Sequence, residues 1–196
     1  MKKIALFLGC ILTLPVWAAS DDATGAFGYK LRYFYEEAKE TKDPLNKIVI
    51  KPESEYKFLM FNDYTLSVTP KTYKIYAINA IGKVFTSCQE DSLIIENFLK
   101  KKYEFSSTDR KIDEHVTVQK DDGNLEKDKN IATIYDLSKT RIYLTCNREK
   151  DIIAISYVDT EMAIQASLES QDMFDKNMAD KIKALKDRED FNVKGL

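Results

Sequence analysis

Residues 64–105 read YTLSVTPKTYKIYAINAIGKVFTSCQEDSLIIENFLKKKYEF, and this stretch decides the fold. Apolar and polar residues alternate over residues 64–69, which is typical of a half-buried strand, and Pro70 removes a backbone donor that the ladder would need. Residues 73–85 carry aromatic and β-branched residues on both faces, which indicates a central strand. Gly82 indicates a bulge or a close backbone approach. The two runs therefore predict a β-hairpin.

A helix is predicted directly after this hairpin. Ser87 is a cap residue, and Glu90 follows it at the spacing of a capping box. Asp91 adds negative charge to the first turn, and residues 100–102 are three lysines in the last turn. Both ends therefore match the helix dipole.

The C-terminal part of the chain repeats the same order of elements. Residues 140–147 and 151–158 predict a second hairpin, and a helix is predicted from Thr160 onward. Its apolar residues recur at helical spacing along one face, as an amphipathic helix requires: Phe174, Met178, Ile182 and Leu185. We expect this seam to pack on the sheet, with docking of a partner as the alternative.

Shorter apolar or alternating runs predict the remaining strands, at residues 25–31, 47–51, 56–61, 115–120 and 131–137. Residues 106–114 and 121–130 are polar and predict loops. The acidic residues of the second loop suggest calcium, but their spacing is not that of an EF-hand, so a solvated hairpin tip is the better interpretation. The predicted fold is a single α+β domain over residues 20–196, an antiparallel sheet built from hairpins with helices packed on it. Two hairpin–helix halves are a further hypothesis.

The first eighteen residues predict a secretory signal peptide, cut after Ala18 or the next residue. Lys2 and Lys3 precede an apolar run at residues 4–14 that is too short to span a bilayer. A retained anchor is one alternative. Lipid attachment at Cys10 is another, although the apolar run continues beyond that cysteine. We expect a periplasmic or secreted bacterial protein without a transmembrane segment after cleavage.

Cleavage leaves two cysteines, Cys88 and Cys146. An even pair in an exported chain favours a disulfide, with two buried free thiols as the alternative. The bridge would close a long loop, which on the loop-entropy model constrains the unfolded chain by about 4 kcal/mol.

The charge balance is acidic. The full chain carries 30 basic and 32 acidic residues, and cleavage removes two lysines to leave 28 against 32, a net charge of −4. Nucleic-acid binding is therefore not expected, because it uses a basic surface.

The chain offers few candidates for catalysis. His115 is the one histidine, and we interpret it as a strand residue. The sequence contains no phosphate-binding glycine loop and no metal-ligating helix motif, and two cysteines with one histidine do not make a metal site. We therefore predict no catalytic residue, cofactor or metal. Tyr33, Phe34 and Tyr35 form an aromatic cluster that is a candidate partner surface, with core and edge packing as the alternative.

Several short motifs carry a resemblance to known proteins. They are GAFGYKL at residues 25–31, VTPKT at 68–72, IYAI at 75–78, IGK at 81–83, Cys88, and KKKY at 100–103. With them the chain resembles a set of uncharacterised secreted bacterial proteins. That set has no assigned activity, so the resemblance implies the boundaries of the fold and no mechanism.

The functional prediction is an exported, non-catalytic binding protein, of the inhibitor or immunity type, whose partner is another protein. Eleven tyrosines suit a protein interface, although they equally suit a sheet. One alternative is an envelope glycan or peptide hydrolase that uses acidic residues, which requires two carboxylates with pKa values pushed apart. The other is a structural envelope component that binds peptidoglycan or lipid.

Overall fold

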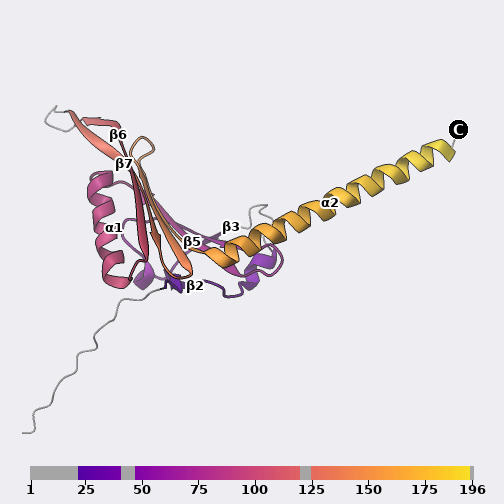
Figure 1. The fold of residues 1–196 in the computed structure, drawn as a ribbon, viewed down its shortest axis with the longest axis horizontal. Coiled ribbons are helices and arrows are strands. Elements are labelled where there is room, and N and C mark those ends of the chain that lie inside the picture. Colours follow the sequence, from indigo (N-terminus) through magenta and orange to yellow (C-terminus); the bar gives the residue numbers. More distant parts are fainter. Residues whose placement is uncertain (1–21, 41–46, 120–124, 195–196) are drawn as a thin grey trace, which may run out of the picture.

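The structure is a computed structural model that describes residues 22–40, 47–119 and 125–194. A seven-stranded antiparallel sheet forms its centre. In order across the sheet, the strands are β3 (Lys47–Ile50), β4 (Asp63–Val68), β5 (Ile75–Lys83), β9 (Ile152–Asp159), β8 (Thr140–Asn147), β7 (Leu125–Asp136) and β6 (Ser107–Gln119). The helices are α1 (Cys88–Lys102) and α2 (Thr160–Lys194). In Figure 1, α1 stands on one side of the strands and α2 runs away on the other.

Smaller elements complete the fold. They are a hairpin of β1 (Gly25–Ala26) and β2 (Tyr29–Lys30), and two 3-10 turns, η1 (Glu36–Glu40) and η2 (Ser54–Tyr56). The predicted signal peptide, with Cys10, lies outside the described residues, as does the loop tip at residues 120–124. The predicted α+β class, an antiparallel sheet of hairpins with helices against it, is confirmed.

The hairpin of β4 and β5 forms as its sequence predicts. Leu66 lies opposite Ile78, and both are fully buried. A Cβ atom on Gly82 would lie 1.7 Å from the carbonyl oxygen of Met60, so this glycine marks a close backbone approach.

The N-terminus of α1 is fixed by two side chains. The Glu90 N–H donates to Ser87 Oγ (3.1 Å), as the capping pattern predicts. The buried Asp91 carboxylate accepts from the Phe85 N–H (2.7 Å) and the Thr86 hydroxyl (2.6 Å). The last residues before α1 are thereby held against its first turn.

The two hairpin–helix halves meet at the centre of the sheet. The second hairpin is β8 and β9, which leads directly into α2, and β9 pairs with β5 so that Ile78 lies opposite Tyr157. The helices differ in position, because α1 contacts β7 and β8 whereas α2 contacts β5 and β9.

One face of the sheet carries the core. Leu66, Ile78, Leu144 and Ile155 point into it and are buried. The Phe27 ring from the β1–β2 hairpin completes an aromatic cluster there, with ring centroids 5.1 Å from Tyr64, 6.1 Å from Phe61 and 6.0 Å from Tyr157. The other face carries smaller and more polar residues that are partly exposed, such as Thr65, Asn79 and Ser156.

The predicted disulfide is present between Cys88 and Cys146, with 5.4 Å between their Cα atoms. It joins the first residue of α1 to β8, and both cysteines are buried in the core. The bridge therefore fixes α1 to the middle of the sheet.

A buried ion pair fixes the same helix to the edge of the sheet. The Glu96 carboxylate, almost fully buried, lies 2.7 Å from Arg110 Nη1 on β6 and 3.8 Å from Lys100 Nζ. Arg110 lies opposite the buried Thr133 and is itself partly buried, and Glu96 neutralises its charge there.

Four local predictions were wrong. Residues 25–31 are not one strand, because β1 and β2 within them pair as a short hairpin. Residues 106–114 are not a loop, because β6 begins at Ser107 and pairs with β7. The inward-facing Arg110 of this strand is stabilised by its ion pair with Glu96. Residues 125–130 belong to β7 rather than to a hairpin tip. Residues 56–61 form no strand, because η2 and a turn tuck Met60 and Phe61 into the core.

The expectation for the C-terminal seam was also wrong. Helix α2 is one continuous helix, and Phe174, Met178, Ile182 and Leu185 are 43 to 60% exposed. The reason is the direction of the helix, which leaves the sheet instead of folding back over it (Figure 1).

We expect that replacing Cys88 or Cys146 with alanine lowers the free energy of unfolding by about 2–5 kcal/mol, since the bridge closes a long loop. Chemical denaturation measures the loss. The double variant is the control: it should lose no more than either single variant, because the bond is already absent. If alkylation without reductant labels both cysteines of the folded protein, the bridge does not exist.

We expect Arg110→Met to cost about 2 kcal/mol or more, because it leaves the Glu96 carboxylate buried beside a more distant lysine. The double variant Glu96→Leu/Arg110→Met should recover most of this loss, since it removes both charges. A single variant as stable as the double variant in urea titrations would show that the pair is not coupled.

Candidate interaction surface

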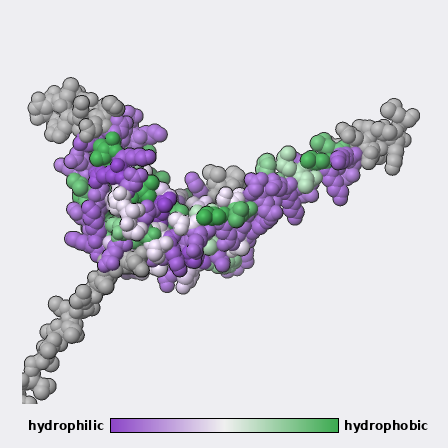
Figure 2. All heavy atoms as spheres, in the orientation of Figure 1, coloured by the Kyte–Doolittle hydropathy of each residue, from purple (hydrophilic) through white to green (hydrophobic). Residues whose placement is uncertain are grey.

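Six large apolar side chains form a row along α2, which we call the α2 stripe: Ile164, Leu168, Phe174, Met178, Ile182 and Leu185. At 3.6 residues per turn, they fall within about a third of the helix circumference. Their side chains are 43 to 66% exposed. Figure 2 shows the corresponding green atoms recurring along the projecting helix. The stripe is therefore an amphipathic face open to solvent.

The stripe faces away from the rest of the molecule. Among residues 160–187 of α2, whose side chains the structure describes, Met162 and Ala166 are the buried ones, and the helix contacts β5 and β9. Ile164 and Ala166 are two positions apart, which places them about 200° apart around the helix. The face that packs on the sheet and the apolar stripe are thus nearly opposite.

The start of α2 is fixed by a buried carboxylate. Asp159 accepts the Met162 N–H at 2.9 Å, which caps the helix. Arg32 donates from Nε to Asp159 (2.5 Å) and from Nη2 to Glu161 (2.6 Å). These two hydrogen bonds raise the pKa of Arg32 further. The guanidinium thereby clamps the first turn of α2 to the N-terminal segment.

A second set of contacts, at Glu169 and Asp172, fixes α2 further along the helix. The Glu169 carboxylate accepts the backbone N–H groups of Lys71 (2.7 Å) and Thr72 (3.2 Å) in the β4–β5 turn, and the Thr72 hydroxyl at 2.9 Å. Burial alone would raise the pKa of Glu169, but these hydrogen bonds lower it overall. The Lys71 ammonium pairs with Asp172. Within the described chain, the polar contacts that tie α2 to other elements end at Asp172.

The predicted aromatic surface is divided by the structure. Tyr33 and Phe34 are exposed, and a lysine ammonium lies over the ring of each. Lys30 Nζ lies 5.2 Å from the centroid of the Tyr33 ring. Lys39 Nζ lies 5.0 Å from the centroid of the Phe34 ring. Tyr35 turns inward and donates its hydroxyl hydrogen to Glu37, and burial followed by this hydrogen bond raises its pKa.

The exposed aromatic residues lie near the first turn of α2. The Arg32 N–H donates to the Ile75 carbonyl (2.7 Å), and the Ile75 N–H donates to the Tyr33 carbonyl (2.9 Å). This segment therefore pairs with the start of β5 beside the point where α2 begins. A role in partner binding for Tyr33, Phe34 and Tyr35 stays a prediction.

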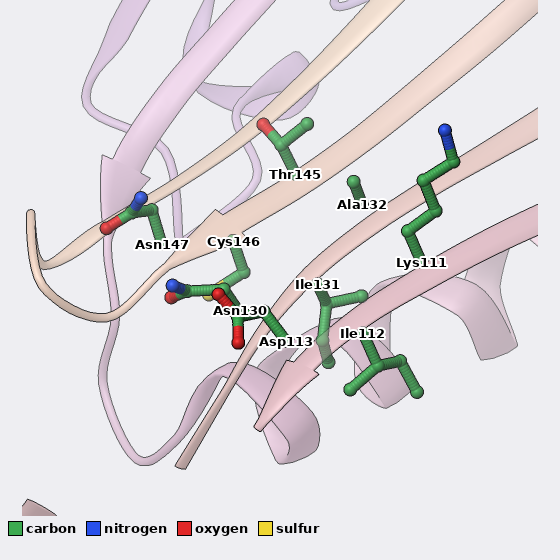
Figure 3. A pocket seen from close by; sticks show the side chains of 9 residues that line it. All are labelled: Lys111, Ile112, Asp113, Asn130, Ile131, Ala132, Thr145, Cys146 and Asn147. Atoms are coloured by element: carbon green, nitrogen blue, oxygen red, sulfur yellow. The ribbon is translucent and has the colours of Figure 1, made fainter. Parts of the chain in front are cut away.

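A groove of about 300 Å³ lies across the middle of β6 and β7 and the end of β8 (Figure 3). Asp113 is the one acidic residue among those that line the groove. In Figure 3 the Lys111 side chain extends away from Asp113. Asn130 is engaged by the Arg148 N–H at 2.8 Å. Among the residues that line it, the groove thus holds one carboxylate rather than a pair.

The titration of the carboxylates bears on the hydrolase alternative. Asp136 accepts from the Ser107 hydroxyl and lies beside Arg141, and both interactions lower its pKa. The pKa of Glu169 is also lowered. A general acid at neutral pH needs the opposite shift. The side chain of His115 lies outside the described residues, and among those described no three potential metal ligands gather.

Two residues of this surface were not predicted from the sequence. Asp159 has a local signal, because an aspartate directly before Thr160 is a favoured cap residue. Arg32 has none, since its partner Asp159 lies 127 positions away. Only the folded arrangement brings them together.

Comparison with known proteins identifies no relative: no family model, no curated protein and no solved structure matches this chain. The resemblance to secreted bacterial proteins therefore stays a prediction. Neither described helix combines the length and the apolar composition needed to cross a membrane.

We expect Glu169→Gln to lower stability by about 1–2 kcal/mol at neutral pH, because the amide cannot accept all the donors of the β4–β5 turn. The folded-state pKa of Glu169 is lowered, so its contribution is present above the unfolded pKa and is lost as the pH falls through the folded value. The difference between the variant and the original chain should therefore shrink in acid.

The matched control for that experiment is Asp172→Asn, which removes an exposed ion pair one turn away and should cost less than about 1 kcal/mol. Urea titrations at several pH values provide the measurement. A Glu169→Gln loss that persists unchanged in acid would contradict the role of the carboxylate.

Proposed function

We propose that this chain is an exported, non-catalytic binding protein and that the α2 stripe is its binding surface. One observation carries the proposal: the stripe stays uncovered along a helix that continues for several turns beyond its last anchor at Asp172. Helices in proteins owe most of their stability to packing of an amphipathic face. A long apolar face without cover in its own chain is therefore suited to cover by another molecule.

The surroundings of the stripe favour a protein as that molecule. Residues 160–194 carry charges of both signs beside the apolar row, as helices that dock on other proteins do. Tyr33 and Phe34, exposed near the start of α2, are of the aromatic type enriched at protein interfaces. An inhibitor or immunity-type role is one form of such binding.

Export is supported by the disulfide, since such bridges persist in oxidising compartments. The apolar run at residues 4–14 supports it further. Both observations agree with a binding protein of the periplasm or the exterior of a bacterial cell.

The test is site-specific photo-crosslinking in the exporting cell. A photoreactive residue at Met178, within the stripe, should give a discrete protein adduct. The same residue at Ala184, exposed on the opposite side of α2, is the matched control and should give none. The mass of the recovered protein should show that the signal peptide is gone.

Other outcomes would count against the proposal. Equal capture at Met178 and Ala184 would show that the stripe is not a specific surface. Capture of lipid or peptidoglycan at Met178 would favour the structural envelope component instead.

A further inference from the structure

We infer that the partner of the α2 stripe is a second copy of this chain, whose α2 lies antiparallel against the first. The inference rests on the proposed function and names its partner. Three properties of α2 carry it: the order of residues along the stripe, the distribution of charge, and the position of the sheet.

Four of the six stripe residues are placed alike in both directions along α2, whereas Phe174 and Leu185 have no apolar counterpart. Gln171 and Asp175 interrupt the apolar row at its centre. Apolar residues lie three and seven positions before Gln171, and again three and seven positions after Asp175. When two copies of α2 lie antiparallel and centred on each other, three kinds of residue pair face each other across the interface. They are Ile164 with Ile182, Leu168 with Met178, and Gln171 with Asp175.

The charge of α2 changes sign near the same centre. Residues 160–175 carry four acidic side chains and no basic one, whereas residues 176–188 carry five basic and two acidic ones. An antiparallel pair sets the acidic half of each helix beside the basic half of the other. A parallel pair would set like charges together, which is unfavourable.

Individual residues show how the charges would meet. Glu161 remains 66% exposed while it binds Arg32, and Asp172 remains 71% exposed while it binds Lys71. Both therefore keep surface for a second cation. In the antiparallel arrangement Glu161 lies beside Lys186 of the second copy, on the same flank of the stripe.

The polar centre specifies the alignment. Gln171 donates to Asp175 at 2.8 Å within one helix, which uses one amide hydrogen and one carboxylate oxygen and leaves the other polar atoms of both groups in need of partners when buried. Placing them opposite the apolar residues of a shifted partner would bury polar groups without hydrogen bonds, whereas the symmetric alignment places polar against polar. Single polar layers in helix pairs fix register in this way.

The fold leaves room for the second helix. The buried residues Met162 and Ala166 lie opposite the stripe, so a partner helix can lie along it without displacing the contact between α2 and the sheet. The antiparallel direction also places the two sheets at opposite ends of the helix pair, in keeping with the way α2 projects in Figure 1.

The test is the mass in solution of the mature, disulfide-bonded chain, measured by light scattering over a range of concentrations. We expect a dimer. Ile182→Glu should raise the dissociation constant by at least on the order of 100-fold, because each dimer loses two apolar contacts and gains two charges within the seam. Ala184→Glu adds the same charge two positions away, on the opposite side of α2, and should leave the dimer intact.

Orientation is tested by cross-linking a mixture of two variants, Ile164→Cys and Ile182→Cys. An antiparallel pair should link the two variants to each other, and neither variant to itself. Cys88 and Cys146 are bonded and buried, so they should not take part. Circular dichroism and denaturation confirm that each variant is folded.

Three results would overturn the inference: a wild-type monomer at every concentration, a dimer that Ile182→Glu leaves unchanged, or self-linking of Ile164→Cys. A monomer whose Met178 position captures a different protein would overturn this inference and leave the proposed function standing. A monomer that captures nothing would overturn both.

Discussion

The pairing of β5 with β9 is the constraint on which the rest of the architecture depends. It joins the two hairpins into one sheet, and it sets Ala77 opposite Val158 near the end of β9. Because β9 ends there, the start of β5 is free to pair with the segment that contains Arg32, through the Ile75 carbonyl. That segment is then in place to bind Asp159 and fix the first turn of α2. The direction in which α2 leaves the sheet follows from this one strand pair.

The two halves use their helices differently. Helix α1 is held against the core face by the Cys88–Cys146 bridge and by Glu96, so Ile95 and Leu99 are buried, whereas Leu93, Ile94 and Phe98 on its outer side stay exposed. Helix α2 is held over its first turns and then continues alone, so its apolar residues remain on the surface. The same local order of hairpin and helix thus gives one helix that packs along the sheet and one that projects from it. The row of uncovered apolar side chains lies on α2 rather than in the open groove between β6 and β8.

Local sequence predicts most where several signals agree. Alternation, Pro70 and the Ser87 cap all specify the same hairpin and helix, and the structure contains them. The first part of strand β6, residues 107–114, was missed because its inward Arg110 is compatible with a core only once Glu96 is beside it, which no local pattern reveals. For α2, helical periodicity predicted the stripe but not what covers it, since a helix packed on its own sheet and one packed on a partner have the same spacing. The bond between Arg32 and Asp159 joins distant parts of the chain and has no local signal in Arg32.

The most direct test of the central claim, that α2 depends on a partner beyond its last anchor, is amide hydrogen exchange over residues 176–187 of the mature protein. We expect protection comparable to that of α1 at high protein concentration, with faster exchange on dilution as the partner dissociates. Protection of α1 should not change, because its contacts lie within one chain. Exchange of residues 176–187 as fast as in an unfolded chain at every concentration would contradict the claim.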